Sequence, residues 1–153
     1  MVQAGDPAPL FDLEDTTGGK VRLADLRGRR VVVYFYPKDD TPGCTREACD
    51  FRDASRDFAA AGVVVIGISP DTTASHRAFR DKHGLNFHLL ADPDRQAIEA
   101  YGVWREKTLY GKKRMGVERS TFLIDQAGQI QVAMRAVKVD DHVAAVLNLA
   151  RGG

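Results

Sequence analysis

The sequence has few cysteines, no strong excess of charge and no long hydrophobic run. Only 2 of its 153 residues are cysteines, which is too few for a scaffold held together by disulfides. The 22 basic and 21 acidic residues nearly balance, so no strong field favours nucleic acid or an anionic membrane surface. The longest apolar stretch, residues 58–68, has 11 residues and contains two glycines, whereas a membrane-spanning helix needs about 20. We therefore expect neither nucleic acid nor a membrane among the partners.

The N-terminus lacks the basic segment and the apolar run that are typical of a signal peptide. Together with the low cysteine count, this predicts a cytoplasmic protein, and paired thiols there are more often catalytic, redox-sensing or metal-binding than structural. The four histidines are not arranged as ligands with the cysteines, and we expect no metal and no cofactor. These histidines are His76, His83, His88 and His142.

Alternating strand and helix patterns predict a single α/β domain over residues 1–153. Two fully apolar runs, 31–36 and 63–68, are typical of strands buried on both faces, and the segment between them predicts a helix that ends at Gly62. The other expected elements are a hairpin around a turn at 16–19, a helix at 73–83, a strand at 87–90, helical turns at 97–101, strands at 121–124 and 130–136, and a helix at 141–150. This order predicts a thioredoxin-like fold, with a central mixed sheet flanked by helices and an N-terminal hairpin extension.

Both cysteines lie near the start of the helix expected between the two buried strands, five residues apart. On an ideal helix, five residues advance about 7.5 Å and rotate roughly 140°, which separates the Cα atoms by about 8.6 Å. A disulfide needs these atoms within about 7 Å. Cys44 and Cys49 are therefore either two independent thiols or a pair that bonds only when the helix unwinds.

The residues before the first cysteine are typical of a helix N-terminus. Thr41 suits the N-cap, and Pro42 suits the first helical position. Gly43 lets the backbone approach a bound ligand closely. Cys44 then lies in the first turn, where unpaired backbone N–H groups and the helix dipole stabilise a thiolate. Cys44 is therefore the predicted nucleophile, whereas Cys49 falls on the polar side of the same helix.

Residues 37–44, PKDDTPGC, resemble the Pro-x-x-x-Thr-x-x-Cys signature of the peroxiredoxins. The continuation CTREAC at 44–49 is similar to the peroxiredoxin Q, or bacterioferritin comigratory protein, branch of that family. Further matches are YFYP at 34–37, GISPD at 67–71, YGVW at 101–104 and RSTFLID at 119–125. The resemblance covers nearly the whole chain, with its motifs in the right order.

The resemblance implies a peroxidase that acts on hydrogen peroxide and organic hydroperoxides and is regenerated by thioredoxin or a similar dithiol reductant. Cys44 matches the peroxidatic cysteine, which attacks peroxide and becomes a sulfenic acid. Cys49 matches the resolving cysteine, which forms a disulfide with it in the same chain. Thr41 and Arg119 match the residues that hold the peroxide beside the thiolate, and Pro37 matches the proline that walls the pocket. A resolving cysteine in the same chain removes the need for a second subunit, so we expect a monomer.

The chemistry of peroxide reduction agrees with these roles. Negative charge moves from sulfur to the departing oxygen, so donors fixed along that path stabilise the transition state. The expected donors are the hydroxyl of Thr41, the amides of Gly43 and Cys44, and the guanidinium of Arg119.

Several alternatives stay open at this point. Arg119 could be a solvated arginine at a strand start, Thr41 a simple N-cap and Pro37 a strand terminator. The chain could instead be a thiol–disulfide exchange protein, although the absence of Cys-x-x-Cys weighs against that, or a redox sensor on the same fold.

Two further segments have no assigned role in the reaction. Residues 112–114 are expected to form a solvated loop that could guide a partner. Trp104, Tyr101 and Tyr110 are expected in the core or lining the pocket.

Overall fold

The computed structural model describes residues 2–152 and contains both strands and helices. The strands are β1 (Asp12–Asp15), β2 (Lys20–Arg22), β3 (Arg30–Phe35), β4 (Val63–Ser69), β5 (His88–Ala91), β6 (Trp104–Leu109), β7 (Lys112–Val117), β8 (Ser120–Ile124) and β9 (Ile130–Met134). The helices are α1 (Pro42–Asp53), α2 (Ser55–Ala60), α3 (Thr73–His83), α4 (Gln96–Ala100), α5 (His142–Gly152) and the short 3-10 helix η1 (Leu23–Leu26).

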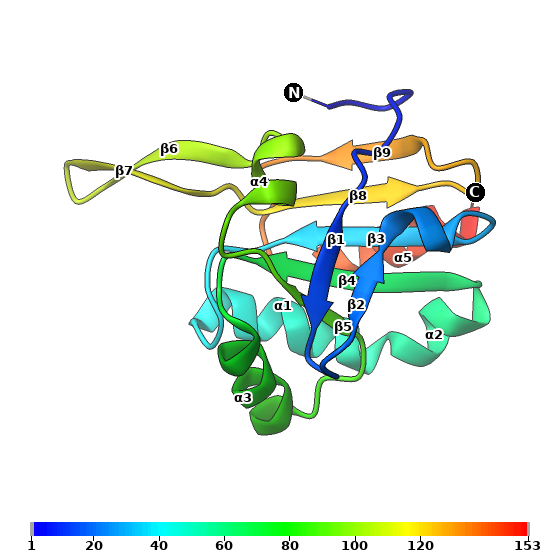
Figure 1. Cartoon of the computed structure of the whole chain (residues 1–153), viewed down its shortest axis with the longest axis horizontal. Helices are drawn as coiled ribbons and strands as arrows, with labels where there is room; N and C mark the ends of the chain where they lie inside the picture. The colour runs from blue at the N-terminus through cyan, green and yellow to red at the C-terminus, as the bar shows by residue number, and fades with distance from the viewer. Residues whose placement is uncertain (1, 153) are drawn as a thin grey trace.

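A seven-stranded mixed sheet runs through the centre of the molecule in the order β2-β1-β5-β4-β3-β8-β9 (Figure 1). The strands β3, β4 and β5 are parallel, whereas β8 pairs antiparallel with β3, and β9 in turn pairs antiparallel with β8. The hairpin β1–β2 extends the other edge, antiparallel to β5. The predicted mixed sheet and N-terminal hairpin are thus confirmed, while the assignment of the whole chain to one domain stays a prediction. Among residues 2–152, no helix is long and apolar enough to cross a membrane.

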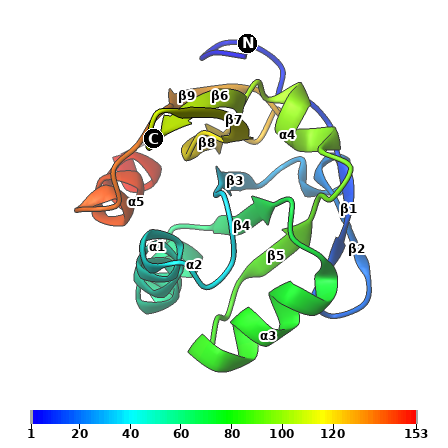
Figure 2. The same ribbon diagram turned by 90° about the vertical axis from the view of Figure 1, so that its left-hand side faces the viewer.

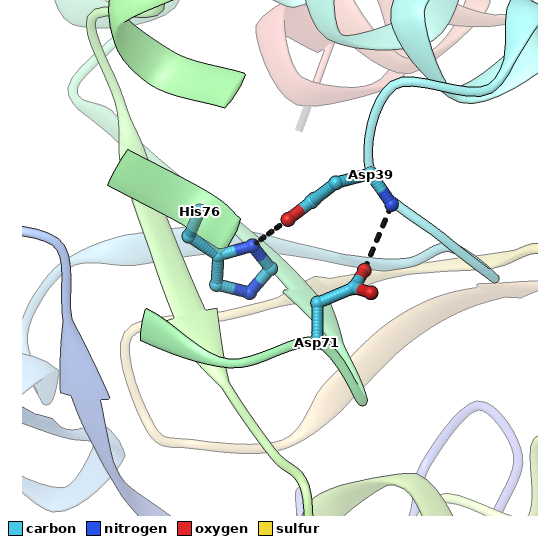
Figure 3. Close-up of side chains that lie close together, drawn as sticks. All are labelled: Asp39, Asp71 and His76. Atoms are coloured by element: carbon cyan, nitrogen blue, oxygen red, sulfur yellow. Dashed lines mark hydrogen bonds and ion pairs between the residues drawn. The ribbon is translucent and has the colours of Figure 1, made fainter. Parts of the chain in front are cut away.

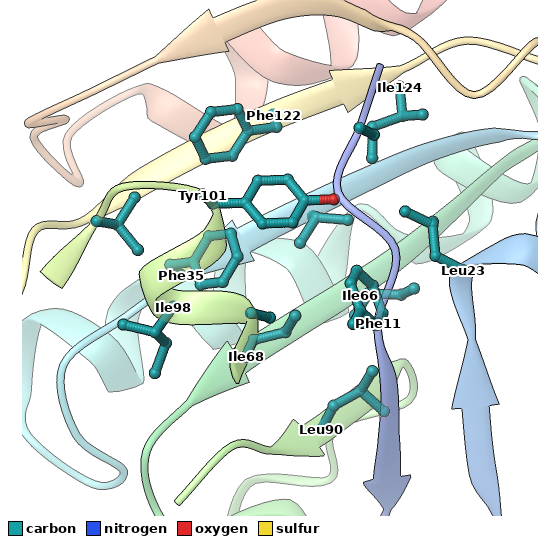
Figure 4. Packing of buried hydrophobic residues seen from close by; sticks show 14 of the residues in the cluster. Phe11, Leu23, Phe35, Ile66, Ile68, Leu90, Ile98, Tyr101, Phe122 and Ile124 are labelled. Atoms are coloured by element: carbon teal, nitrogen blue, oxygen red, sulfur yellow. The ribbon is translucent and has the colours of Figure 1, made fainter. Parts of the chain in front are cut away.

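Both faces of the sheet are covered, which explains the two fully apolar runs in the sequence. Successive β3 residues alternate between two buried clusters: Val33 and Phe35 enter one, and Val32 and Tyr34 enter the other. The first cluster packs beneath η1, α4 and the N-terminal segment, with Tyr101 set among apolar neighbours from several strands (Figure 4). The second cluster is covered by α1, α2, α3 and α5 (Figure 2). The cysteine helix is therefore one of the elements that bury the second face.

The largest departure from expectation is the antiparallel ribbon β6–β7. Residues 112–114 were expected in a loop, but they lie in β7, paired with β6, so that prediction is wrong. Most residues of the ribbon are exposed, so its sequence shows no alternation of apolar and polar residues to indicate a strand. Tyr110 was expected in the core or pocket and is instead 96% exposed, whereas Tyr101 is fully buried and Trp104 packs against the core.

The expected helix up to Gly62 is divided at Ala54, which separates α1 from α2. The Ala54 N–H donates to the Asp50 carbonyl, and the Phe58 N–H donates to the Ala54 carbonyl. The helical bonding pattern thus continues across the break, and the apolar face that carries Phe51 and Phe58 stays buried against the sheet.

Candidate active site

Cys44 lies in the first turn of α1 and is almost completely buried, with 2% of its surface exposed. Thr41 occupies the N-cap position in an extended conformation, and Pro42 begins the helix. The Thr45 N–H donates to the Thr41 carbonyl at 2.8 Å, which forms the first turn. The amides of Gly43 and Cys44 precede this bond, so they have no helical carbonyl to bind and are available to a ligand.

The register of the sheet brings Arg119 to this helix end. Ser120 begins β8 directly opposite Phe35, the last residue of β3, and Arg119 comes immediately before it. Because α1 also follows β3, the two segments meet at the same end of the strand. The Arg119 side chain is only 16% exposed, so it is not the solvated arginine that the sequence left open.

The guanidinium of Arg119 bridges the thiol and a buried carboxylate. Its Nη2 donates to Cys44 Sγ at 3.3 Å, and its Nη1 donates to Glu47 Oε1 at 2.6 Å. Glu47 lies one turn after Cys44 on α1 and is completely buried. The planar fork of an arginine suits this arrangement, because two donors leave one rigid group in fixed directions. The carboxylate thus fixes the direction from which the cation approaches sulfur.

Sequence reasoning missed Glu47, although one signal was available. A glutamate three residues after Cys44 must share the helix face that packs on the sheet, and a buried carboxylate requires a partner. Burial raises the pKa of Glu47 to about 7, while Arg119 acts in the opposite direction. Its second oxygen, Oε2, is buried and has no hydrogen-bond partner within residues 2–152. The pKa of Glu47 thus lies close to neutral pH, whereas that of Arg119, despite burial, is raised by Glu47 and Cys44, so the guanidinium stays charged.

An aromatic stack supports the site from the sheet side. The Tyr34 ring stacks on Phe51 of α1, with ring centroids 4.5 Å apart. Burial, and then the charges of Glu47 and Cys44, raises the pKa of Tyr34 well above its usual value, so its hydroxyl stays protonated. Gly67 of β4 makes room for this ring, since a Cβ there would lie 2.8 Å from it. The stack gives α1 a rigid apolar base.

Gly43 is in close contact with the guanidinium of Arg119. A Cβ at this position would lie 3.3 Å from Arg119 Nη2 and 3.9 Å from a methyl group of Val139. The absence of a side chain thus lets the guanidinium lie across the helix N-terminus. The contact with Arg119 is thus a structural reason for glycine here, while the close approach of a ligand to Gly43 stays a prediction.

The other predicted site residues lie around this centre. The Thr41 hydroxyl does not cap the helix; it donates to the Lys38 carbonyl at 2.9 Å. Pro37 is half-buried in the loop between β3 and α1. Cys49 is half-buried further along α1, and both cysteines are free thiols in a continuous helix. The structure therefore brings Gly43, Cys44 and Arg119 together and leaves Cys49 apart from them.

A buried network, which was not predicted from the sequence, anchors the loop that leads into α1. Asp39 Oδ2 lies 2.6 Å from His76 Nδ1 (Figure 3) and accepts a bond from the Ser75 hydroxyl at 2.8 Å. The Tyr36 hydroxyl donates to Asp39 Oδ1 at 2.6 Å, and the Asp39 N–H donates to Asp71 Oδ2 at 2.8 Å. The network ties the loop to β3 and to the start of α3.

Asp39, Asp71 and His76 also have the composition of a cation site, with ligand atoms within 4.8 Å of one another. Their atoms are already engaged, however. Asp71 Oδ2 also accepts from the Ser69 hydroxyl at 2.7 Å, and His76 Nε2 donates to the Leu90 carbonyl at 3.0 Å. A cation would have to displace these donors, so the cluster is best described as a hydrogen-bonded anchor.

The chain is similar to known proteins over nearly its whole length. Residues 4–133 match the AhpC/TSA family. The peroxiredoxin Bcp of Bacillus subtilis is 49% identical over 95% of this chain and 93% of its own length. A structure of Xanthomonas campestris peroxiredoxin Q superposes with a TM-score of 0.92 at 39% identity, covering 99% of this chain and 98% of that one. The bacterioferritin comigratory protein of the same organism, studied for alkyl peroxide reduction, matches with a TM-score of 0.89 at 41% identity over 93% of this chain and 90% of that one.

The full-length superposition also confirms the thioredoxin-like α/β fold. The family match spans most of the chain, and the relatives cover nearly all of it. The chain therefore belongs to the AhpC/TSA family of peroxiredoxins, in the branch that contains Bcp and peroxiredoxin Q, and is a thiol peroxidase.

Proposed function

We propose that the protein reduces hydrogen peroxide and organic hydroperoxides through Cys44, resolves the product with Cys49 and is regenerated by a thioredoxin-type dithiol. The observation that carries this proposal is the 3.3 Å contact between Arg119 Nη2 and Cys44 Sγ at the N-terminus of α1. The alkyl peroxide reduction studied in the Xanthomonas campestris relative supports organic hydroperoxides as substrates.

In the first step, the Cys44 thiolate attacks the terminal oxygen of the peroxide. The sulfur–oxygen bond forms as the oxygen–oxygen bond breaks, and the departing oxygen takes up a proton and leaves as water or an alcohol. The guanidinium of Arg119 and the amides of Gly43 and Cys44 are placed to stabilise the charge that moves along this path. The Thr41 hydroxyl donates its hydrogen to the Lys38 carbonyl, so its oxygen is free to accept a hydrogen bond from the peroxide O–H.

In the second step, the Cys49 thiolate attacks the sulfenic sulfur of Cys44, and the hydroxyl group leaves as water. In an ideal helix the Cα atoms of Cys44 and Cys49 are about 8.6 Å apart, whereas a disulfide needs them within about 7 Å. The first turns of α1 must therefore open before the disulfide can form. Helix termini have low local stability, which makes such opening feasible. If opening is slower than a second encounter with peroxide, Cys44 is oxidised to sulfinic acid instead.

In the third step, a dithiol protein reduces the disulfide by two successive thiol–disulfide exchanges. Both thiols are then free, and α1 can form again. Because attack and resolution occur in one chain, the reaction requires no second subunit, and we infer that the protein is a monomer. We also infer that it acts in the cytoplasm.

A coupled assay tests the proposal: NADPH oxidation through thioredoxin reductase and thioredoxin, measured with each peroxide. The wild-type protein is expected to turn over. Cys44→Ser is expected to show no reaction with peroxide, and Cys49→Ser to consume one equivalent and then stop. The absence of turnover with any peroxide or dithiol would refute the proposal, and normal cycling of Cys49→Ser with thioredoxin would refute the resolving role.

A further inference from the structure

The ribbon β6–β7 forms a separate two-stranded sheet that projects from the body of the molecule (Figure 1). Its turn, Tyr110-Gly111, has positive φ angles of 52° and 76°. At its base, β7 ends at Val117, two residues before Arg119. The ribbon is thus joined directly to the segment that supplies the active-site cation.

The two faces of the ribbon differ in charge. Directly opposed residues of an antiparallel pair share a face. On one face Glu106 lies opposite Met115, and Lys113 Nζ lies 3.7 Å from Glu106, so the charges there compensate each other. On the other face Lys107 lies opposite Arg114. The strand residues of this second face, which we call the cationic face, are Arg105, Lys107, Leu109, Lys112, Arg114 and Gly116.

The cationic face contains no acidic residue in either strand. Within residues 2–152, the structure shows no ion pair that involves Lys112 or Arg114, and both are exposed. The chain as a whole has a net charge of only +1, so this positive charge is local. Leu109 on the same face is 62% exposed and the adjacent Tyr110 is 96% exposed. The face therefore offers cations around an exposed apolar tip, which is the composition of a surface for an anionic partner.

The cationic face continues toward the active site. The stem of Lys107 lies against Gly116, because a Cβ at Gly116 would be 3.5 Å from the Lys107 Cδ. The side chain thus runs back along the ribbon toward its base. Burial and Arg119 lower the pKa of Lys107 there, whereas Cys44 and Glu118 raise it, so this lysine lies within the electrostatic field of the reacting centre. A partner bound along the face would reach the mouth of the site.

We propose that the cationic face of β6–β7 docks an acidic protein dithiol, the reductant of the Cys44–Cys49 disulfide. This inference rests on the proposed function, because that disulfide is the partner's substrate. One partner thiolate attacks a disulfide sulfur and releases the other cysteine of this chain as a thiolate. The second partner thiolate then attacks the sulfur of the first and displaces the remaining cysteine of this chain, so a disulfide forms in the partner while two electrons and two protons pass to Cys44 and Cys49.

A protein accounts for these features better than a membrane does. A lipid surface requires a larger basic cluster or a deeper apolar wedge than a few cations with Leu109 and Tyr110 can supply. Charge complementarity at the edge of a protein interface mainly raises the association rate. Fast association suits a reductant, because it must bind each oxidised molecule in turn.

The test is the double variant Lys112→Glu with Arg114→Glu, which reverses two charges of the face and leaves the catalytic residues intact. In the thioredoxin-coupled assay with an acidic thioredoxin, we expect kcat/KM for thioredoxin to fall about tenfold or more. The wild-type kcat/KM should fall with rising salt and that of the variant should not. Single-turnover reduction of peroxide and regeneration by dithiothreitol should stay at the wild-type rate.

The matched control is Lys20→Glu with Arg29→Glu, which makes the same change in net charge at exposed positions on β2 and ahead of β3. This control should keep the wild-type kcat/KM for thioredoxin. Equal losses in both variants, or no loss in the ribbon variant, would overturn the proposal. Ribbon-dependent binding of the wild-type protein to phosphatidylglycerol vesicles with unchanged thioredoxin kinetics would overturn it in favour of a membrane. Failure of the proposed function itself would appear separately, as no peroxide turnover with dithiothreitol.

Discussion

Replacement of Arg119 by lysine tests the catalytic geometry, because it keeps the positive charge and removes the fork. In the wild-type protein one rigid group donates to Cys44 Sγ at 3.3 Å and to Glu47 Oε1 at 2.6 Å. A lysine ammonium is a single charged group on a flexible stem, so it cannot donate to Cys44 Sγ and Glu47 Oε1 in the same fixed geometry. Because Glu47 is fully buried, we expect the ammonium to pair with the carboxylate and to leave the sulfur.

The expected cost is one hydrogen bond to a charged group. Such bonds contribute about 1.5–3 kcal/mol, which corresponds to roughly a 10- to 150-fold fall in the rate constant for peroxide. Competition with horseradish peroxidase for a limiting amount of hydrogen peroxide measures this constant. Reduction of the oxidised variant by dithiothreitol should be unchanged, which separates loss of catalysis from loss of fold. A wild-type rate constant in Arg119→Lys would refute the reasoning, because charge alone would then be sufficient.

Three further predictions follow from the same contacts. Burial raises the pKa of Glu47 from 4.5 to about 7, so between these two pH values the native state holds a proton that the unfolded chain releases. The free energy of unfolding should therefore fall by up to ~3 kcal/mol as the pH rises from 4.5 to about 7. Urea unfolding should show this pH dependence in the wild-type protein and not in Glu47→Gln, and equal profiles would contradict it. Gly43→Ala places a Cβ 3.3 Å from Arg119 Nη2 and should therefore slow the reaction with peroxide several-fold. The free energy of unfolding should change by less than about 1 kcal/mol. An unchanged rate would show that the guanidinium can shift without loss of activity. Asp39→Asn replaces one carboxylate oxygen of the buried network with a donor and should cost about 1–3 kcal/mol in thermal or urea unfolding. It should also speed amide exchange in residues 37–41, and unchanged exchange would contradict the anchoring role.

The sequence predicted the elements whose pattern is local. The buried strands β3 and β4 appeared as apolar runs, and the start of α1 appeared as Thr41-Pro42 before Cys44. The contact between Arg119 and Cys44 could not be derived in this way, because it depends on the register of β8 against β3. Only the family resemblance pointed to Arg119 as a partner of the thiol.

Glu47 and the ribbon β6–β7 escaped prediction for opposite physical reasons. Glu47 was overlooked because a charged residue is ordinarily assigned to the surface, yet its position one turn after Cys44 places it on the buried face. The ribbon β6–β7 was overlooked because most of it is exposed, so no apolar periodicity marks its strands. Its charge pattern becomes informative only when the pairing of Lys107 with Arg114 is known.

The central claim is that Cys44 reacts with peroxide and Cys49 resolves it within the same chain. Its most direct test is intact-mass analysis and peptide mapping of the wild-type protein after one equivalent of hydrogen peroxide. We predict the loss of two hydrogen atoms, a peptide in which Cys44 and Cys49 are joined by a disulfide, and no covalent dimer. A stable sulfenic or sulfinic acid on Cys44 with Cys49 still free, or a disulfide between two chains, would contradict the account.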